Sequence, residues 1–369
     1  MFECRNFVLF YRIRAKRGKQ KLKIDFYADI SGKPCLVEEI STLGPMLCSN
    51  AAAADFMRVN LFSNWANGSP GLLWWCASDQ TNLTDPPYSW CMIERELGLL
   101  DVNHKPKPAL QVMRDFSEWL SGLDFDLPPA KTDAVCIATL DQDHWGISYM
   151  SYILAKQAGA NIRFAYAGGA IPDAPVYLLP SLSGARSLLL PQYKLLRERV
   201  KNGATLYISN DDAYLSEFQD LTGLRVLDSA RSPANGWIYG LPYEKQWQFF
   251  LETAGAAVLE TDENDGPLFT RHTYGKGTVY YLNFPLEKSL LYQENAFDQP
   301  YYKIYANILA TVPTEKLGIT LHSDGVDTYA VIINYSQEPQ PFPKHIQTGC
   351  ILRGNGEIIP AFDCCVVKI

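Results

Sequence analysis

Carboxylates and aromatic rings follow two short apolar runs in the first quarter of the chain. Residues 33–41 read Lys-Pro-Cys-Leu-Val-Glu-Glu-Ile-Ser, and residues 71–79 read Gly-Leu-Leu-Trp-Trp-Cys-Ala-Ser-Asp. Each run has strand character and is bounded by Pro or Gly, so each delivers its polar and aromatic residues at a strand's carboxyl end. Paired carboxylates can attack and protonate a glycosidic bond, and a flat indole suits the apolar face of a sugar.

The residues between these two runs predict a helix. Residues 51–67 carry Phe56, Val59, Phe62 and Ala66 at three- and four-residue spacing, and Asn67-Gly68 is a stop signal. The predicted order is therefore strand, helix, strand. A (β/α)₈ barrel places its chemistry at the carboxyl ends of such strands.

These motifs resemble the last two βα units of retaining glycoside hydrolases of clan A, which include cellulase-like enzymes and family 42 β-galactosidases. Strand seven of that family carries Pro-x-x-x-x-Glu-x-Gly or Ser, and residues 34–41 match it with Glu39 at the nucleophile's position. Strand eight resembles Gly-x-x-Tyr/Trp-Trp-x-x-x-Asp. The match to residues 71–79 implies that Trp75 stacks under the sugar, with Trp74 before it and Asp79 on the loop that follows.

Adjacent strand residues point to opposite faces, so we expect only one of Glu38 and Glu39 to face the barrel lumen. Taken singly, the Glu pair is typical of a solvated strand end, and Trp74-Trp75 is typical of core packing. Their spacing and order together favour the glycosidase. Further along, residues 96–110 resemble the passage into the final barrel helix, with Pro108 near the helix start.

The resemblance supplies a nucleophile without its acid/base partner. A complete barrel takes about 250 residues, roughly twice the length that precedes the next domain here. The family's acid/base Glu usually follows an Asn, and no Asn-Glu pair lies upstream of Glu39. We regard Asp79, Glu94 and Glu96 as poor replacements. The resemblance thus implies the carboxyl-terminal part of a longer glycosidase, or a relative that has lost half its barrel, and we expect this chain alone to hydrolyse little.

A second domain is predicted over residues 129–314, with alternating strands and helices that indicate an open, mostly parallel sheet of flavodoxin-like type. Residues 193–196 with 201–206, and later residues 271–281, resemble the amidotransferase-like domain that follows the barrel in family 42 β-galactosidases. The resemblance implies a scaffold that often mediates contacts in a homo-oligomer. The strands and helices are expected over residues 133–140, 149–158, 161–166, 174–179, 191–201, 204–209 and 212–223.

An enzyme built on this second domain is less consistent with the sequence. A class I amidotransferase needs a reactive Cys on a sharp turn, but Cys136 lies within a predicted strand. Gly168-Gly169 lacks the spacing of a dinucleotide fingerprint. His144 and Trp145 lie where doubly wound sheets bind ligands, although packing is the better interpretation.

Residues 315–369 change to short strands separated by polar turns, with strands expected over 318–322, 328–335, 350–352 and 365–369. The run around Tyr329 to Ser336 resembles the small β-sandwich that ends many glycoside hydrolases. Residues 1–128, 129–314 and 315–369 are thus three predicted domains: a partial (β/α) barrel, a flavodoxin-like domain and a small all-β sandwich.

The amino-acid composition limits the classes of partner and cofactor that we expect for this chain. The chain has 369 residues, 47% of them hydrophobic, which can build several cores. A net charge of −7 argues against nucleic acid as a partner, so the basic run from Arg12 to Lys23 is interpreted as a solvated amphipathic strand or a tail. No stretch approaches the roughly 20 apolar residues of a membrane span. Nine cysteines without a Cys-x-x-Cys pair look like buried thiols, which favours a reducing compartment and argues against a zinc site. The compartment is left open, with the cytoplasm favoured, and no cofactor or other metal is expected.

Two hypotheses of different class follow. The first is a retaining glycoside hydrolase that acts on a β-linked oligo- or polysaccharide, with the sugar and linkage open. The second is a non-catalytic carbohydrate-binding or assembly protein that uses the flavodoxin-like domain as a scaffold.

Overall fold

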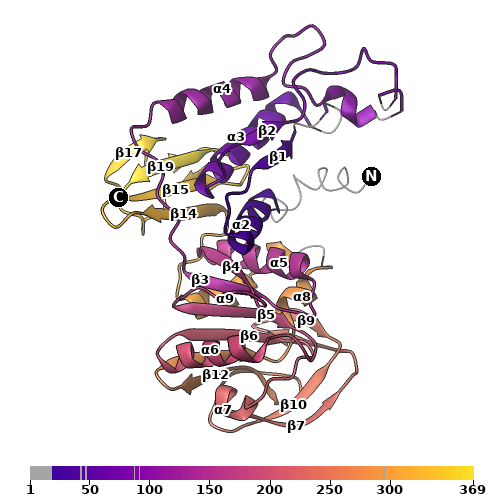
Figure 1. Ribbon diagram of the computed structural model, residues 1–369, viewed down its shortest axis with the longest axis vertical. Coiled ribbons are helices and arrows are strands. Elements are labelled where there is room, and N and C mark those ends of the chain that lie inside the picture. Colours follow the sequence, from indigo (N-terminus) through magenta and orange to yellow (C-terminus); the bar gives the residue numbers. More distant parts are fainter. Residues whose placement is uncertain (1–18, 42–43, 46–47, 87, 91, 294–295) are drawn as a thin grey trace. The chain divides into compact units, whose positions relative to one another are not determined.

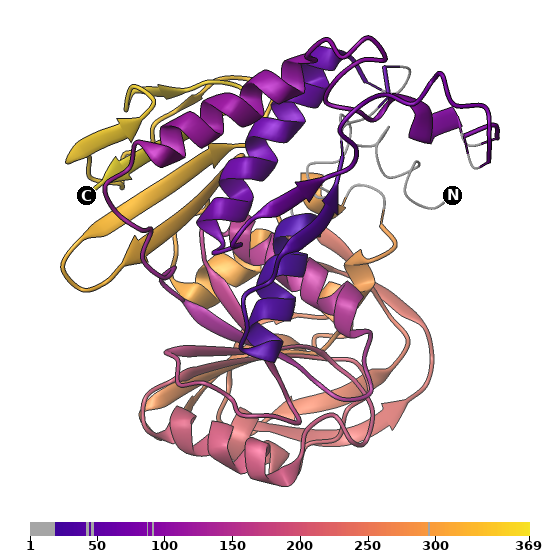
Figure 2. The ribbon, with the colours of Figure 1, turned by 45° about the horizontal axis from the view of Figure 1, so that its top comes forward.

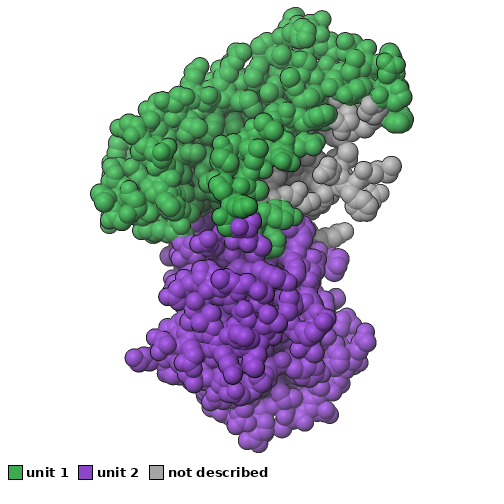
Figure 3. Space-filling view, in the orientation of Figure 1, with its two compact units in different colours: residues 1–28, 32–131, 314–369 green, residues 29–31, 132–313 purple. Residues whose placement is uncertain are grey.

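The structure, a computed structural model, describes residues 19–41, 44–45, 48–86, 88–90, 92–293 and 296–369. Most of its helices and strands are labelled in Figure 1, and Figure 2 shows them from a second direction. The chain divides into two compact units (Figure 3): residues 1–28, 32–131 and 314–369 form the first, and residues 29–31 and 132–313 form the second. Residues 1–128 and 315–369, expected as separate domains, therefore belong to one unit.

The first unit contains the strand, helix and strand expected around the two motifs. These are β1 (Val37–Ile40), α3 (Asn50–Ala66) and β2 (Leu72–Trp74). Ser49 caps α3, because its Oγ accepts a hydrogen bond from the N–H of Ala52 at 3.1 Å. β1 and β2 pair in parallel, as consecutive barrel strands do.

A helix precedes β1 where the sequence analysis placed a strand or a tail. This helix, α2 (Lys19–Ser31), includes the last part of the basic run, so that prediction is wrong from Lys19 onward. Lys, Leu and Gln are strong helix formers, and in this segment they outweigh the alternation of basic residues. Residues 1–18, which hold the rest of the basic run, lie outside the described residues.

The short 3₁₀ helix η2 (Met92–Glu96) and the expected helix α4 (Pro108–Ser121) follow β2. Pro108 begins α4, where its missing N–H costs no hydrogen bond. A core between α3 and α4 contains Met57, Leu61 and Val112, with Leu72 and Trp74 of β2 packed against it. The helix pair therefore packs against β2.

The carboxyl-terminal strands of the first unit form an antiparallel sheet in the order β14-β15-β19-β17. Their bounds are β14 (Leu317–Ser323), β15 (Thr328–Asn334), β17 (Cys350–Arg353) and β19 (Cys364–Lys368), and the predicted strands there are confirmed. Val331 and Ile333 of β15 pack with residues of α3, so a helix covers this face. Ala330 and Ile332 pack in a separate core with Ile359 of the small ribbon formed by β16 (Gln340–Pro341) and β18 (Ile358–Ile359).

The second unit is built on a seven-stranded sheet in the order β11-β12-β13-β6-β5-β3-β4. The strands are β3 (Ala134–Ala138), β4 (Ile162–Tyr166), β5 (Val176–Leu182), β6 (Thr205–Asn210), β11 (Ala257–Thr261), β12 (Pro267–Tyr274) and β13 (Gly277–Leu282). The five strands from β13 to β4 are parallel. Numbered along the chain and read from β4, these five parallel strands stand in the order 2-1-3-4-5.

Helices lie on both faces of this sheet (Figure 1). On one face α5 (His144–Gln157) contacts α8 (Leu286–Leu290) and α9 (Tyr302–Leu309), preceded by η3 (Ala296–Asp298). On the other face, α6 (Leu190–Lys201) packs its buried Leu196 and Val200 into the sheet's core. The short helix α7 (Phe218–Thr222) follows β6.

Two antiparallel ribbons separate α7 from the last parallel strand, and the sequence analysis did not predict them. β7 (Leu224–Ala230) pairs with β10 (Gln248–Thr253), and β8 (Ala234–Ile238) pairs with β9 (Leu241–Lys245). The parallel strand order is unaffected, because the whole insertion lies between β6 and β13.

The outer strand β4 is capped by a carboxylate. Asp29 accepts a hydrogen bond from the N–H of Phe164 at 2.9 Å and another from Nε of Arg163 at 3.0 Å. Burial raises the pKa of Asp29, while these two donors oppose the rise. An edge N–H that could otherwise pair with another chain is thereby satisfied.

Two expectations from composition can be compared with the described residues. None of their helices has the length and apolar character needed to cross a membrane. Of their cysteines, Cys136, Cys364 and Cys365 are buried as expected, whereas Cys350 is exposed and Cys35, Cys48 and Cys76 are half-buried. The expectation of uniformly buried thiols is therefore wrong.

Candidate functional site

Both carboxylates of the first motif are exposed at the end of β1. Val37 is matched with Leu72 and Ile40 with Trp74, so three steps along β1 correspond to two along β2. This register shift places Glu38 and Glu39 opposite Leu73, and both Glu side chains are exposed. The pairing is irregular here, so exposure alone does not assign the two side chains to faces, and the alternation with one Glu on each face stays a prediction.

The two tryptophans of the second motif have different environments. Trp74 packs against the α3–α4 core, which corresponds to the structural interpretation of this ring. Trp75 follows the end of β2 and is 41% exposed, and Leu73 on the same side of the strand is 56% exposed. The N–H of Trp75 donates to the carbonyl of Ile40 at 2.8 Å, which extends the parallel ladder to the ends of both motifs. Trp75 and Glu39 therefore belong to neighbouring strand ends.

Asp79 is engaged within its own loop. Its Oδ1 lies 2.6 Å from Nζ of Lys107 and accepts the N–H of Gly98 at 2.9 Å. The two charged side chains are only 10% and 11% exposed. Direct contact with a sugar, which the resemblance implied for Asp79, would compete with this ion pair.

The other acids considered as proton donors lie on the same loop. Glu96 is half-buried at the end of η2, and its backbone carbonyl accepts from Nζ of Lys107 at 3.1 Å. The side chain of Glu94 lies outside the described residues. Among the described His, Cys, Asp and Glu residues, no group of three or more could hold a metal ion.

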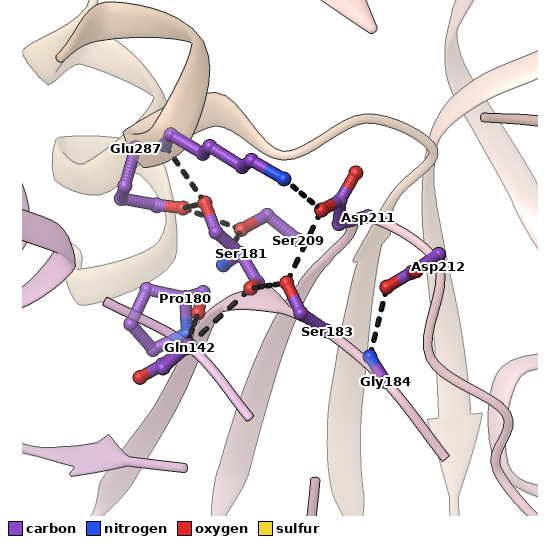
Figure 4. A network of polar contacts seen from close by, with 10 residues as sticks. Gln142, Pro180, Ser181, Ser183, Gly184, Ser209, Asp211, Asp212 and Glu287 are labelled. Atoms are coloured by element: carbon purple, nitrogen blue, oxygen red, sulfur yellow. Dashed lines mark hydrogen bonds and ion pairs between the residues drawn. The ribbon is translucent and has the colours of Figure 1, made fainter. Parts of the chain in front are cut away.

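The second unit has its own polar cluster at the carboxyl ends of β5 and β6 (Figure 4). Glu287 is fully buried and accepts four hydroxyl hydrogen bonds. The donors are Ser181 at 2.9 Å, Ser209 at 2.5 Å, Tyr207 at 3.1 Å and Tyr305 at 2.8 Å. An ionised carboxylate, which only accepts hydrogen bonds, fits this set of donors.

The network around Glu287 shifts the pKa values of two tyrosines that belong to it. Burial and, after it, the charge of Glu287 raise the pKa values of Tyr207 and Tyr305. Sequence reasoning missed this network. The available signal was an acidic residue five positions after the last parallel strand, where loops of doubly wound sheets carry polar groups.

Cys136 and His144, which an enzyme built on the second unit would use, have structural roles. Cys136 is fully buried in β3, and burial raises the pKa of its thiol. His144 donates from Nε2 to the carbonyl of Thr139 at 2.6 Å and packs edge-on against Tyr166. A reactive thiolate needs exposure and a lowered pKa, so Cys136 does not fit an amidotransferase nucleophile.

A buried lysine lies elsewhere in the second unit. Lys245 of β9 is 5% exposed, and its Nζ donates to the carbonyl of Asn283 at 3.3 Å. Burial lowers the pKa of Lys245, and the charge of Asp262 opposes this effect. The group therefore carries a desolvation penalty when it is charged.

Comparison with known proteins bears on the fold. No protein-family model matches the chain, and no curated protein sequence matches it. Among solved structures, the chain resembles Gan42B, a GH42 beta-galactosidase, with 15% identity and a TM-score of 0.70 over 96% of this chain and 57% of that one. The chain shares its fold with glycoside hydrolases.

Two further solved glycosidases have a similar fold. A beta-galactosidase from Bacillus circulans sp. alkalophilus has 11% identity and a TM-score of 0.69 over 95% of this chain and 57% of its own. The exo-beta-1,4-mannosidase Op5Man5 from Opitutaceae bacterium strain TAV5 has 21% identity and a TM-score of 0.66 over 80% of this chain and 55% of its own. The chain thus spans a little more than half the length of these solved glycosidases.

Proposed function

We propose that the chain is the carboxyl-terminal part of a retaining glycoside hydrolase for β-linked sugars, with Glu39 as nucleophile and Trp75 as the platform under the sugar. The observation that carries the proposal is the pairing of β1 with β2, which brings an exposed Glu39 and a half-exposed Trp75 to neighbouring strand ends. The fold shared with β-galactosidases and a mannosidase supports it. The carbohydrate partner is thus a β-galactoside, β-mannoside or β-glucoside.

In this mechanism a Glu39 oxygen attacks the anomeric carbon and forms a glycosyl ester, while the bond to the leaving oxygen breaks. A general acid protonates that oxygen, and water then releases the sugar from Glu39. Asp79 is a poor acid because Lys107 holds it. The acid/base residue is therefore proposed to come from the remainder of the barrel.

The second unit is proposed to be a flavodoxin-like, amidotransferase-like scaffold, supported by its strand order and by the burial of Cys136. The carboxyl-terminal strands are proposed to correspond to the small β-sandwich domain of glycoside hydrolases. The alternative function, a non-catalytic carbohydrate-binding or assembly protein, is favoured by one observation: the described part of the barrel has only two strands.

A covalent trap tests the proposal. A deoxyfluoro β-glycosyl fluoride reacts with a retaining nucleophile without acid assistance, because fluoride leaves unaided. We expect peptide mass spectrometry to find the sugar on Glu39, with no label in Glu39→Gln and unchanged labelling in the matched control Glu38→Gln. Aryl β-glycosides with activated leaving groups should be hydrolysed slowly, with the same dependence on Glu39. Folded protein that takes up no label would support the non-catalytic alternative.

A further inference from the structure

An ion pair closes the loop that follows Trp75. Asp79 and Lys107 are 28 residues apart, and their charged atoms lie 2.6 Å from each other with about one tenth of each side chain exposed. Lys107 also donates to the carbonyl of Glu96, and Asp79 accepts the N–H of Gly98. The pair thereby joins the beginning of the loop to its end.

Backbone hydrogen bonds connect this ion pair to Trp75. Leu99 N–H donates to the carbonyl of Cys76 at 3.1 Å, and Leu100 N–H donates to that of Ala77 at 3.0 Å. The N–H of Asp79 returns a bond to the carbonyl of Leu100 at 2.8 Å. The residues just after Trp75 are therefore tied to residues 98–100, while Trp75 itself is tied to β1.

Close backbone approach strengthens the same connection. A Cβ atom on Gly98 would lie 2.3 Å from the backbone nitrogen of Asp79, closer than any real contact. Only glycine lets the two segments meet at this distance. The ion pair, the short ladder and the close approach at Gly98 therefore all hold the same two segments of the loop together.

We propose that Asp79 and Lys107 are positioning residues that hold Trp75 in one orientation and thereby determine the affinity of the site for a sugar. The part that concerns the sugar rests on the proposed function. Removing one partner leaves the other charge poorly solvated, so the segment must rearrange to reach water. A stacking platform that changes orientation loses the preorganisation on which its affinity depends.

Fluorine NMR of protein labelled with fluorotryptophan tests the positioning directly. The chain has eight Trp residues, and a Trp75→Phe variant assigns the Trp75 signal. In Asp79→Asn and in Lys107→Met, each shown to be folded by circular dichroism, we expect the Trp75 signal to broaden or split, while the signals of Trp119 and Trp237 stay in place. The matched control is Glu338→Gln, which removes one charge from the exposed Lys316–Glu338 pair of the same unit and should leave the Trp75 signal unchanged.

The outcomes separate this inference from the proposed function. A single, unshifted Trp75 signal in both folded variants overturns the positioning role, and an equal change in all Trp signals indicates a general structural role, which also overturns it. Titration of the unaltered protein with methyl β-galactoside or methyl β-mannoside then tests the site. If the positioning holds but neither sugar moves the Trp75 signal, the proposed function fails while the positioning stands.

If the sugar does move the Trp75 signal, the two variants should bind it more weakly. Activated aryl glycosides should also be hydrolysed more slowly, by up to about a hundredfold if the ring moves by an ångström. The loss should appear mainly in KM, because Trp75 contacts the sugar rather than the breaking bond. Unchanged affinity in a variant whose Trp75 signal has broadened would overturn the link between this ion pair and sugar binding.

Discussion

Both units have carboxylates beside the carboxyl ends of their strands, and the environments of these carboxylates are opposite. Glu38 and Glu39 at the end of β1 are exposed beside an exposed aromatic ring. Glu287, which follows the last parallel strand of the second unit, is fully buried and accepts four hydroxyl groups. A carboxylate whose acceptor sites are filled stabilises the fold, whereas an exposed one can meet a substrate. Position at a strand's carboxyl end is therefore insufficient to identify a catalytic acid.

The largest effect should come from removing the buried carboxylate. Glu287→Leu leaves two Ser and two Tyr hydroxyl groups without their acceptor, so we expect the free energy of unfolding to fall by about 3 kcal/mol or more. Urea denaturation followed by circular dichroism measures the loss. Glu287→Gln, which keeps one acceptor oxygen, should lose less. A Glu287→Leu protein as stable as the unaltered one would show that the network contributes little.

The buried lysine gives an intermediate effect that depends on pH. Because burial lowers the folded pKa of Lys245, its charge destabilises the fold below that pKa, and the penalty fades as pH rises toward the unfolded pKa. Lys245→Met should therefore raise the free energy of unfolding at neutral pH by about 1 kcal/mol, an advantage that shrinks in alkaline solution.

Urea titrations at several pH values measure this difference. Lys303→Met, which removes an exposed lysine from α9 of the same unit, serves as the control and should show no such trend. A constant advantage of Lys245→Met at every pH would mean that shape rather than charge explains it.

The smallest effect on stability should come from the exposed carboxylates. Glu38→Gln and Glu39→Gln should each change the free energy of unfolding by less than about 0.5 kcal/mol, because both side chains are already in water. Differential scanning calorimetry checks this. A large loss in either variant would mean that the carboxylate has a structural partner, and the contrast with Glu287 would disappear.

Local patterns were sufficient to predict β1, α3, β2, α4 and the four parallel strands β3 to β6 of the second unit. Apolar runs, helical spacing and the stop signal at Asn67-Gly68 each act within a few residues, so the sequence displays them directly. The ribbons β7 to β10 were missed because their exposed apolar residues, such as Leu227 and Trp237, blur the alternation of a half-buried strand.

The chemistry of the sites was less predictable than the elements. The register shift at Glu38 and Glu39 depends on how β1 meets β2, and no local pattern reveals it. The partners of Asp79 and of Glu287 lie up to 106 residues away along the chain. The positions of the strands could thus be predicted from the sequence. The hydrogen-bond and ion-pair partners of each carboxylate could not, because they come from tertiary contacts.

Helix α3 has a consequence for anyone who wishes to shorten the gene. Its Met57 and Leu61 pack toward α4, while its Val59 and Phe62 pack against β15 and β19 of the carboxyl-terminal sheet. Truncation at residue 314 would strip one side of this helix and leave a wide apolar surface, which promotes aggregation. The last 55 residues are therefore poorly suited to removal as an independent module, and a usable minimal fragment must keep them together with α3.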